Sequence, residues 1–174
     1  CLSGNMAGNF ILGMNEEKVG CSLKHFAANN QEYRRFIESN NIDMRALMDI
    51  YLKSFKVAMD ISKPATIMCA YNKINEVYCS ENKWLLMDIL REKFGFDGLV
   101  MSDWGAVNNR VKAVEAGLDL EMPSCNGVTD KQVVKAVQNG ELEEKYFDKA
   151  VKNVLNLVDK YKYINDIRVS FDEK

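Results

Sequence analysis

The sequence predicts an α/β fold built on parallel strands, and three observations support this class. Short apolar runs alternate with longer segments whose apolar residues recur at helical spacing. The short runs are almost continuously apolar, as expected for parallel strands that are buried on both faces. The chain has 174 residues, 47% of them hydrophobic, which suffices for one domain with a core. Helical crossovers between parallel strands give the simplest arrangement.

Four strands and six helices are expected along the chain. The strands are expected at 19–23, 65–70, 98–101 and 118–121, and the helices at 3–16, 43–61, 82–94, 107–116, 129–140 and 143–162. Asp43 is the expected N-cap of the second helix, Gly117 should end the fourth, and residues 129–132 form a capping-box pattern. The last helix is expected to bury Phe147, Val151, Val154, Leu155 and Val158.

Two architectures fit this order: a doubly wound open sheet and part of a TIM-like (β/α)8 barrel. Both place function in the loops at the carboxyl ends of the strands. A complete barrel typically has about 250 residues, so a barrel here would be only part of one.

Composition excludes several classes of function. With 23 Lys and Arg against 25 Asp and Glu, the net charge is -2, which gives no reason to expect nucleic acid or an anionic membrane as partner. The five cysteines form no CxxC pair, and His25 is the only histidine, so a metal site is poorly supported. No Gly-rich phosphate loop is present, and no cofactor is expected. Reduced, buried thiols favour a reducing compartment, and a cytoplasmic location is expected.

Polar side chains follow each of the first three expected strands. Lys24 and His25 follow the first, Tyr71 the second, and Asp103 and Trp104 the third. Because the carboxyl ends of parallel strands share one rim, these side chains should converge. Charged groups that bind hydroxyls and an indole that packs on an apolar ring face form a set suited to a sugar.

Each of these residues also has a structural interpretation. His25 could be an ordinary buried histidine, Asp103 a helix cap, and Trp104 a packing residue. Lys24 is harder to explain structurally, because a lysine directly after a buried strand needs a partner or solvent. The joint occurrence of all three clusters favours function.

Three motifs resemble those of glycoside hydrolase family 3, the family of β-glucosidases and β-xylosidases. They read KHFAANNQE, IMCAYNKINEVYCSEN and GLVMSDWGAVNNRVKAVEAGLDLEMP, in the family's order. The resemblance implies a TIM-like barrel followed by an α/β sandwich domain, with the active site between them. Residues 1–162 would form the C-terminal part of the barrel domain, and 163–174 a tail or the start of a linker.

The resemblance also implies roles for single residues. Asp103 matches the catalytic nucleophile, Lys24 and His25 match a pair that binds sugar hydroxyls, and Arg35, with Arg34 beside it as the alternative, matches a further sugar ligand. Tyr71 would border the nucleophile, and Trp104 would line the same pocket. Ala27 and Ala28 stand where N-acetylglucosamine-specific members carry the end of a motif with a second histidine, which favours the glucosidase and xylosidase branch.

The expected activity is hydrolysis of β-D-glucosyl or related residues with retention. Such enzymes use two carboxyl groups about 5–5.5 Å apart, and the second is not identified among Glu32, Glu76 and Glu121. The chain would then be an incomplete piece that needs the remaining barrel and the sandwich domain as partners. Alternatives are a non-catalytic carbohydrate-binding remnant and a phosphorylase or transglycosylase. Open sheet edges would also favour self-association.

Overall fold

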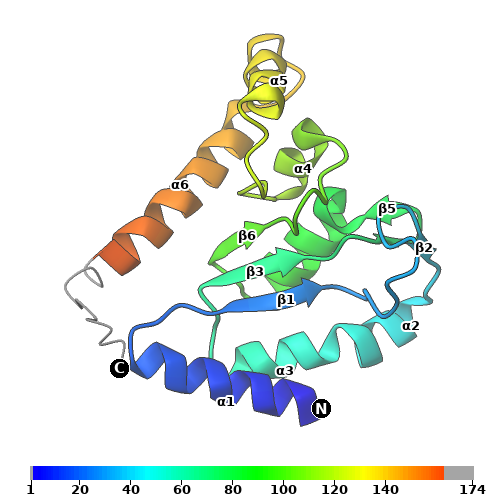
Figure 1. Cartoon of the computed structure of the whole chain (residues 1–174), viewed down its shortest axis with the longest axis vertical. Helices are drawn as coiled ribbons and strands as arrows, with labels where there is room; N and C mark the ends of the chain where they lie inside the picture. The colour runs from blue at the N-terminus through cyan, green and yellow to red at the C-terminus, as the bar shows by residue number, and fades with distance from the viewer. Residues whose placement is uncertain (1, 163–174) are drawn as a thin grey trace, which may run out of the picture.

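A computed structural model describes residues 2–162 of the chain (Figure 1). Its main sheet has three parallel strands, β1 (Ser22–Phe26), β3 (Thr66–Cys69) and β6 (Leu99–Met101), in the order β1-β3-β6. A parallel bridge from Met101 to Leu120 extends it by one more position. The positions follow chain order, without the reversal that defines a doubly wound sheet. This order fits the barrel alternative.

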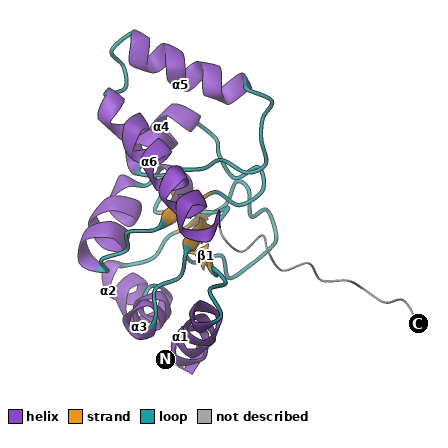
Figure 2. Cartoon of the chain, turned by 90° about the vertical axis from the view of Figure 1, so that its left-hand side faces the viewer, coloured by secondary structure: helices purple, strands orange, loops and turns teal. Residues whose placement is uncertain are grey.

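Helices flank this sheet beyond β1 and beyond β6 (Figures 1 and 2). Helices α1 (Leu2–Glu16) and α3 (Lys53–Ile61) lie together on one side, and α4 (Arg110–Ala116) and α5 (Val128–Gln138) lie toward the other, as Figure 2 shows. Helix α6 (Glu144–Tyr161) runs along the near side in that view. The remaining helical segments are α2 (Met44–Ala46), η1 (Leu47–Tyr51), η2 (Cys79–Glu81) and η3 (Trp84–Lys93). Within 2–162, none of the helices is long and apolar enough to cross a membrane.

Glycines set the close approach of α1 to α3. A Cβ at Gly4 would lie 2.7 Å from the Ser54 carbonyl oxygen, and one at Gly8 would lie 2.8 Å from the Ile61 side chain. No larger residue fits at either position without moving a helix, so this small-residue face of α1 fixes the packing.

The central core lies between the main sheet and the helices. Phe26, Ile67 and Val100 of the three strands are fully buried, and they pack with Leu85, Leu86 and Leu90 of η3. Ile89 is also buried, so the apolar face predicted for 82–94 is confirmed. The Asp43 cap is confirmed as well, because its side chain accepts from the Ala46 amide.

A second, smaller sheet was not predicted. It joins β2 (Ser39–Asn40) to β4 (Lys73–Ile74) in parallel, and β4 to β5 (Val77–Tyr78) in antiparallel. Asn75 and Glu76 form the two-residue hairpin turn with φ of 48° and 71°, both left-handed. Strands of two residues are too short for a periodicity argument, so only the tertiary structure reveals them.

Four sequence predictions are wrong in detail. The strand expected at 118–121 is reduced to the single bridge position at Leu120. Strand β1 lies three residues later than predicted and includes Lys24 and His25. The capping box at 129–132 does not form, because α5 begins at Val128 with Gly127 as its N-cap. The apolar face of α6 is not buried among the described residues.

The apolar side chains on the outer face of α6 are exposed because no described segment packs against them. Phe147, Val151, Leu155 and Val158 are 39–61% exposed, whereas Ala150 and Asn153 on the opposite face are buried. Helix α6 thus packs on the fold through the side that carries Ala150 and Asn153, and nothing within 2–162 covers its outer apolar stripe. The predicted tail at 163–174 lies outside the described residues.

Candidate active site

Asp103 lies two residues after β6, at the carboxyl end of the sheet. Its carboxylate accepts a hydrogen bond from the Trp104 amide at 2.7 Å, and its other oxygen lies 3.2 Å from His25 Nε2. The residue is 8% exposed, so one carboxylate is nearly enclosed at the rim where the fold places chemistry. The helix-cap interpretation is wrong, because Asn109 caps α4.

Lys24 and His25 occupy an irregular part of β1. Leu23 pairs with Ile67, and Phe26 pairs with Cys69. Between these two pairs β1 advances by three residues while β3 advances by two, so β1 contains a bulge. This bulge re-aims the side chains between the paired residues, a use of bulges common beside active sites. Partial burial, opposed by the Asp103 carboxylate, lowers the pKa of His25.

Lys24 is exposed and has no hydrogen-bond or ion-pair partner within the described part of the chain. Its ammonium group lies close enough to His25 to lower the pKa of that imidazole further. The Lys24 ammonium group is therefore exposed to solvent and has no structural partner among the described residues. Its charge is available to bind a ligand.

Tyr71 and Arg35 form the other side of the site. The Arg35 guanidinium lies 4.3 Å from the centre of the Tyr71 ring, and the Phe36 ring lies 4.5 Å from the same ring. Tyr71 is buried, and burial together with its hydrogen bond to Asp103 raises the pKa of its phenol. The phenol thus keeps its proton and donates to the carboxylate.

Arg35, rather than Arg34, belongs to this group. Arg35 also pairs with Glu32, whose other oxygen accepts from Asn29 at 3.3 Å. Arg34 is exposed, with φ of 57°, and it acts as a turn residue whose carbonyl oxygen accepts from two following amides.

Sequence reasoning named Glu32 only as a candidate acid, without its pairing to Arg35, and missed Phe36. The signal for Glu32 was present, since a carboxylate three residues before an arginine commonly pairs with it. Phe36 carried no signal, because its contact with Tyr71 spans 35 residues and depends on the small second sheet. The Tyr78 hydroxyl donates to the Phe36 carbonyl oxygen at 3.1 Å and ties this loop to β5.

Buried amides and hydroxyls hold the rim in place. Asn72 is fully buried and donates to the Ala27 carbonyl oxygen at 3.3 Å, across β1 and β3. Ser80 donates to the Ala106 carbonyl oxygen at 3.2 Å, beyond Asp103. These bonds join the three loops that carry the site, so its geometry is fixed by the scaffold rather than by the side chains alone.

Trp104 points away from the core, because it is 53% exposed. The packing interpretation is therefore wrong for this residue, and its ring is open to a ligand. Within residues 2–162, no group of three or more His, Cys, Asp or Glu side chains is placed to hold a metal ion.

The site thus brings His25, Tyr71, Arg35 and Asp103 together from three strand ends and one loop. The sequence model of the glycosyl hydrolase family 3 N terminal domain matches residues 2–157. The chain belongs to glycosyl hydrolase family 3. Family membership, the parallel sheet and its strand order together make it part of a TIM-like barrel.

Relatives with known names support the same family. The chain is 48% identical to thermostable beta-glucosidase B of Acetivibrio thermocellus over 157 residues, which is 90% of this chain and 21% of that protein. It is 45% identical to an exo-alpha-(1->6)-L-arabinopyranosidase of Bifidobacterium longum, over 91% of this chain and 21% of that protein. The chain therefore spans about a fifth of the length of these family 3 relatives.

A solved structure agrees with the fold. Beta-glucosidase 3B of Thermotoga neapolitana, in complex with alpha-D-glucose, matches with a TM-score of 0.90 at 40% identity. The match covers 96% of this chain and 24% of that one.

Proposed function

We propose that the chain is the nucleophile-bearing part of a retaining β-glycosidase, with β-D-glucosides as substrates. The observation that carries the proposal is the enclosed Asp103 carboxylate at a barrel rim, in contact with a histidine and a buried tyrosine. A nucleophile must stay ionised and fixed, and hydrogen bonds from Tyr71 and the Trp104 amide favour both.

The roles of the other groups follow from their chemistry. Lys24, His25 and Arg35 donate hydrogen bonds, and sugar hydroxyls accept them. The exposed Trp104 ring offers an apolar face for the other side of the sugar. In the proposed mechanism, Asp103 attacks the anomeric carbon to form a glycosyl-enzyme, which water then hydrolyses.

The proton donor lies outside the described residues in this proposal. Glu32 pairs with Arg35, Glu76 sits in the hairpin turn, and Glu121 binds Thr129. The Glu32 and Glu121 carboxylates are thus already engaged by other side chains, and Glu76 lies in the exposed turn of the second sheet. The acid therefore comes from the part of a family 3 enzyme that this chain does not span, together with the rest of the barrel.

The experiment that tests the proposal is a chimera. Residues 2–157 replace the matching segment of the Acetivibrio beta-glucosidase B, which supplies the remaining domains. A 2-deoxy-2-fluoro β-glucoside with a good leaving group should label Asp103, and Asp103→Asn should abolish labelling. A folded chimera that is labelled on a different carboxylate refutes the assignment. A folded chimera that binds glucose without hydrolysing aryl glycosides favours the sugar-binding alternative.

The substrate is tested in the same chimera. Aryl β-D-glucoside, β-D-xyloside and α-L-arabinopyranoside are compared by kcat/KM, since one relative is an arabinopyranosidase. The proposal expects the glucoside to be preferred. Stimulation by inorganic phosphate, with release of a sugar phosphate, would instead identify a phosphorylase.

A further inference from the structure

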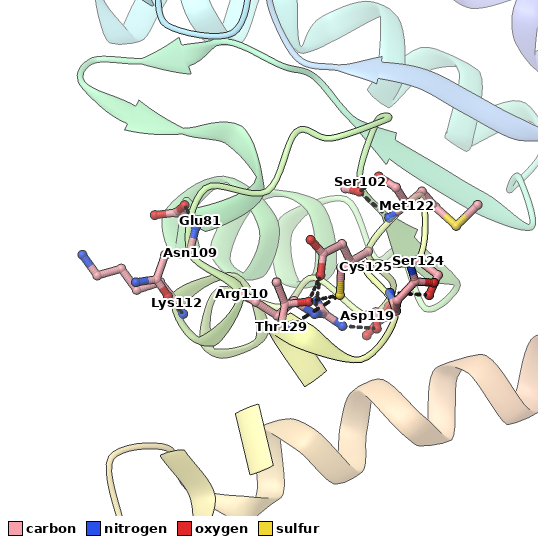
Figure 3. Close-up of polar contacts among 12 residues, drawn as sticks. Glu81, Ser102, Asn109, Arg110, Lys112, Asp119, Met122, Ser124, Cys125 and Thr129 are labelled. Carbon is pink, nitrogen blue, oxygen red and sulfur yellow. Dashed lines mark hydrogen bonds and ion pairs between the residues drawn. The ribbon is translucent and has the colours of Figure 1, made fainter. Parts of the chain in front are cut away.

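A cluster of polar groups lies behind the nucleophile loop and takes no part in the proposed hydrolysis. It contains Arg110, Glu121, Cys125 and Thr129, called here the Cys125 cluster. Figure 3 shows Arg110, Cys125 and Thr129 close together, and Glu121 joins them through the Thr129 hydroxyl and Arg110. Cys125 stands just before α5, an 11-residue helix, and is partly exposed. The cluster connects the start of α4, which carries Arg110, with the start of α5, which carries Thr129. Glu121 and Cys125 lie in the segment between Leu120 and α5.

The Cys125 sulfur is surrounded by hydrogen-bonding groups. Its Sγ accepts from the Thr129 amide at 3.3 Å and contacts the Thr129 hydroxyl. That hydroxyl also donates to Glu121. A hydroxyl has one proton, so the thiol donates to Thr129 while it is neutral. Once the thiol ionises, the hydroxyl can turn and donate to the sulfur.

Arg110 is the independent observation that indicates a ligand. Its side chain is 10% exposed, and its Nη1 has no hydrogen-bond partner in the part of the chain that the structure describes. Nη2 donates to the Asp119 carbonyl oxygen at 3.2 Å, and Nε lies 3.6 Å from Glu121. The guanidinium is close enough to Cys125 to interact with its charge. A buried N–H group without an acceptor is costly, and an anion beside Cys125 would provide one.

The electrostatics of the cluster favour a reactive thiol. The Thr129 hydroxyl is the main cause that lowers the pKa of Cys125, and the α5 amides act in the same direction. The charged groups that face the sulfur are Arg110, which favours the thiolate, and Glu121, which disfavours it. Among the thiols within residues 2–162, burial instead raises the pKa of the partly exposed Cys21 and of the buried Cys69 and Cys79.

The cluster is joined directly to the nucleophile loop. The Gly105 amide donates to the Met122 carbonyl oxygen at 2.8 Å, and the Met122 amide donates to Ser102 Oγ at 2.8 Å. Met122 is three residues before Cys125, so the same short segment carries the thiol and contacts Ser102 and Gly105, one on each side of Asp103. Figure 3 shows the contact between Met122 and Ser102.

We propose that Cys125 is a thiol-modification site that forms a mixed disulfide with small anionic disulfides and thereby loosens the loop that holds Asp103. The thiolate attacks one sulfur of the disulfide and forms a new S–S bond. The original S–S bond breaks, and the other half leaves as a thiolate with the electron pair. The thiol proton goes to solvent, and the positive charge of the Arg110 guanidinium stabilises the anionic half that remains attached.

The test uses the 174-residue chain and no sugar, so its result is independent of the proposed hydrolysis. Dithiobis(nitrobenzoate), an anionic disulfide, and hydroxyethyl disulfide, a neutral one, are each added in limiting amounts, and peptides are mapped by mass spectrometry. Cys125 should react at least about tenfold faster than Cys21, which is the internal control. Thr129→Val should slow Cys125 about fivefold, and Thr129→Ser should restore the rate.

Arg110 is tested by the charge of the reagent. Arg110→Gln should slow the anionic disulfide more than the neutral one, and Arg110→Lys should retain part of the preference. Circular dichroism confirms that each variant is folded. Equal rates at Cys125 and Cys21, or an unchanged rate in folded Thr129→Val, would overturn the proposal.

Coupling to the nucleophile loop is measured by amide hydrogen exchange on the fully modified chain. The peptide that covers 102–105 should exchange several-fold faster, because the Gly105 amide loses its acceptor, while the peptide that covers β3 should not change. Complete modification with unchanged exchange at 102–105 would also overturn the proposal.

Discussion

Asp119 links η3, β6 and α6, and substituting it tests how much this link contributes to the stability of the fold. Its carboxylate accepts from Arg91 Nη2 of η3 at 2.8 Å and from the Val100 amide of β6 at 2.7 Å. Its other oxygen accepts from Asn153 of α6 at 2.9 Å. The Arg91 and Asp119 side chains are only 9% and 2% exposed. Asp119→Ala would therefore leave a buried arginine without its counter-ion.

The expected loss follows from that geometry. Removing one partner of a buried ion pair costs about 3–5 kcal/mol of the free energy of unfolding, because the remaining charge is left without compensation. In a domain of this size each kcal/mol lowers Tm by roughly 2–4 °C, so Asp119→Ala should lower Tm by roughly 6–20 °C. Most of that loss should come from the unpaired charge of Arg91, because removing the small Asp119 side chain costs little packing.

The assay is urea unfolding followed by circular dichroism, with Asp97→Ala as the matched control. Asp97 is 87% exposed and lies 3.9 Å from Lys63, so its loss should cost about 0–1 kcal/mol. The double variant Arg91→Met with Asp119→Leu should be more stable than Asp119→Ala, because no buried charge remains unpaired. Equal stability of Asp119→Ala and Asp97→Ala would refute the account of Asp119 as the link between β6, η3 and α6.

The other predictions concern the site and the exposed face of α6. In the chimera, Lys24→Ala should lower kcat/KM at least tenfold, about 1.4 kcal/mol, with Tm unchanged; a large loss of Tm with normal kcat/KM would contradict this. The pKa of His25 is lowered in the folded chain. Just below about pH 6.5, this histidine is therefore protonated in the unfolded chain but still neutral in the folded chain. Stability should therefore fall as the pH drops through that window, and His25→Gln should flatten the slope of the urea midpoint against pH. The isolated chain should self-associate in size-exclusion chromatography, and Leu155→Gln with Val158→Gln should reduce this, since both residues are 61% exposed; an unchanged elution volume would argue against α6 as the contact face.

The sequence by itself determined the class of fold and most of the side chains that the structure brings together at the rim. Continuous apolar runs and helical spacing are local properties, so β3, β6 and most helices lie where they were predicted. Parallel strands end at one rim, and this rule alone predicted from the sequence that His25, Tyr71 and Asp103 lie together. The Asp43 cap and the Gly117 stop were also correct, because each depends on a few neighbouring residues.

Tertiary structure decided everything that depends on contacts between distant segments. The bulge that shifts β1 needs the register with β3, and the small second sheet needs pairing across more than 30 residues. Thr129 failed as a helix cap because its hydroxyl is engaged by Glu121 and Cys125 instead. The outer stripe of α6 has the pattern of a buried face and is exposed among the described residues. Periodicity shows that a face is apolar, but burial depends on what the rest of the chain places over it.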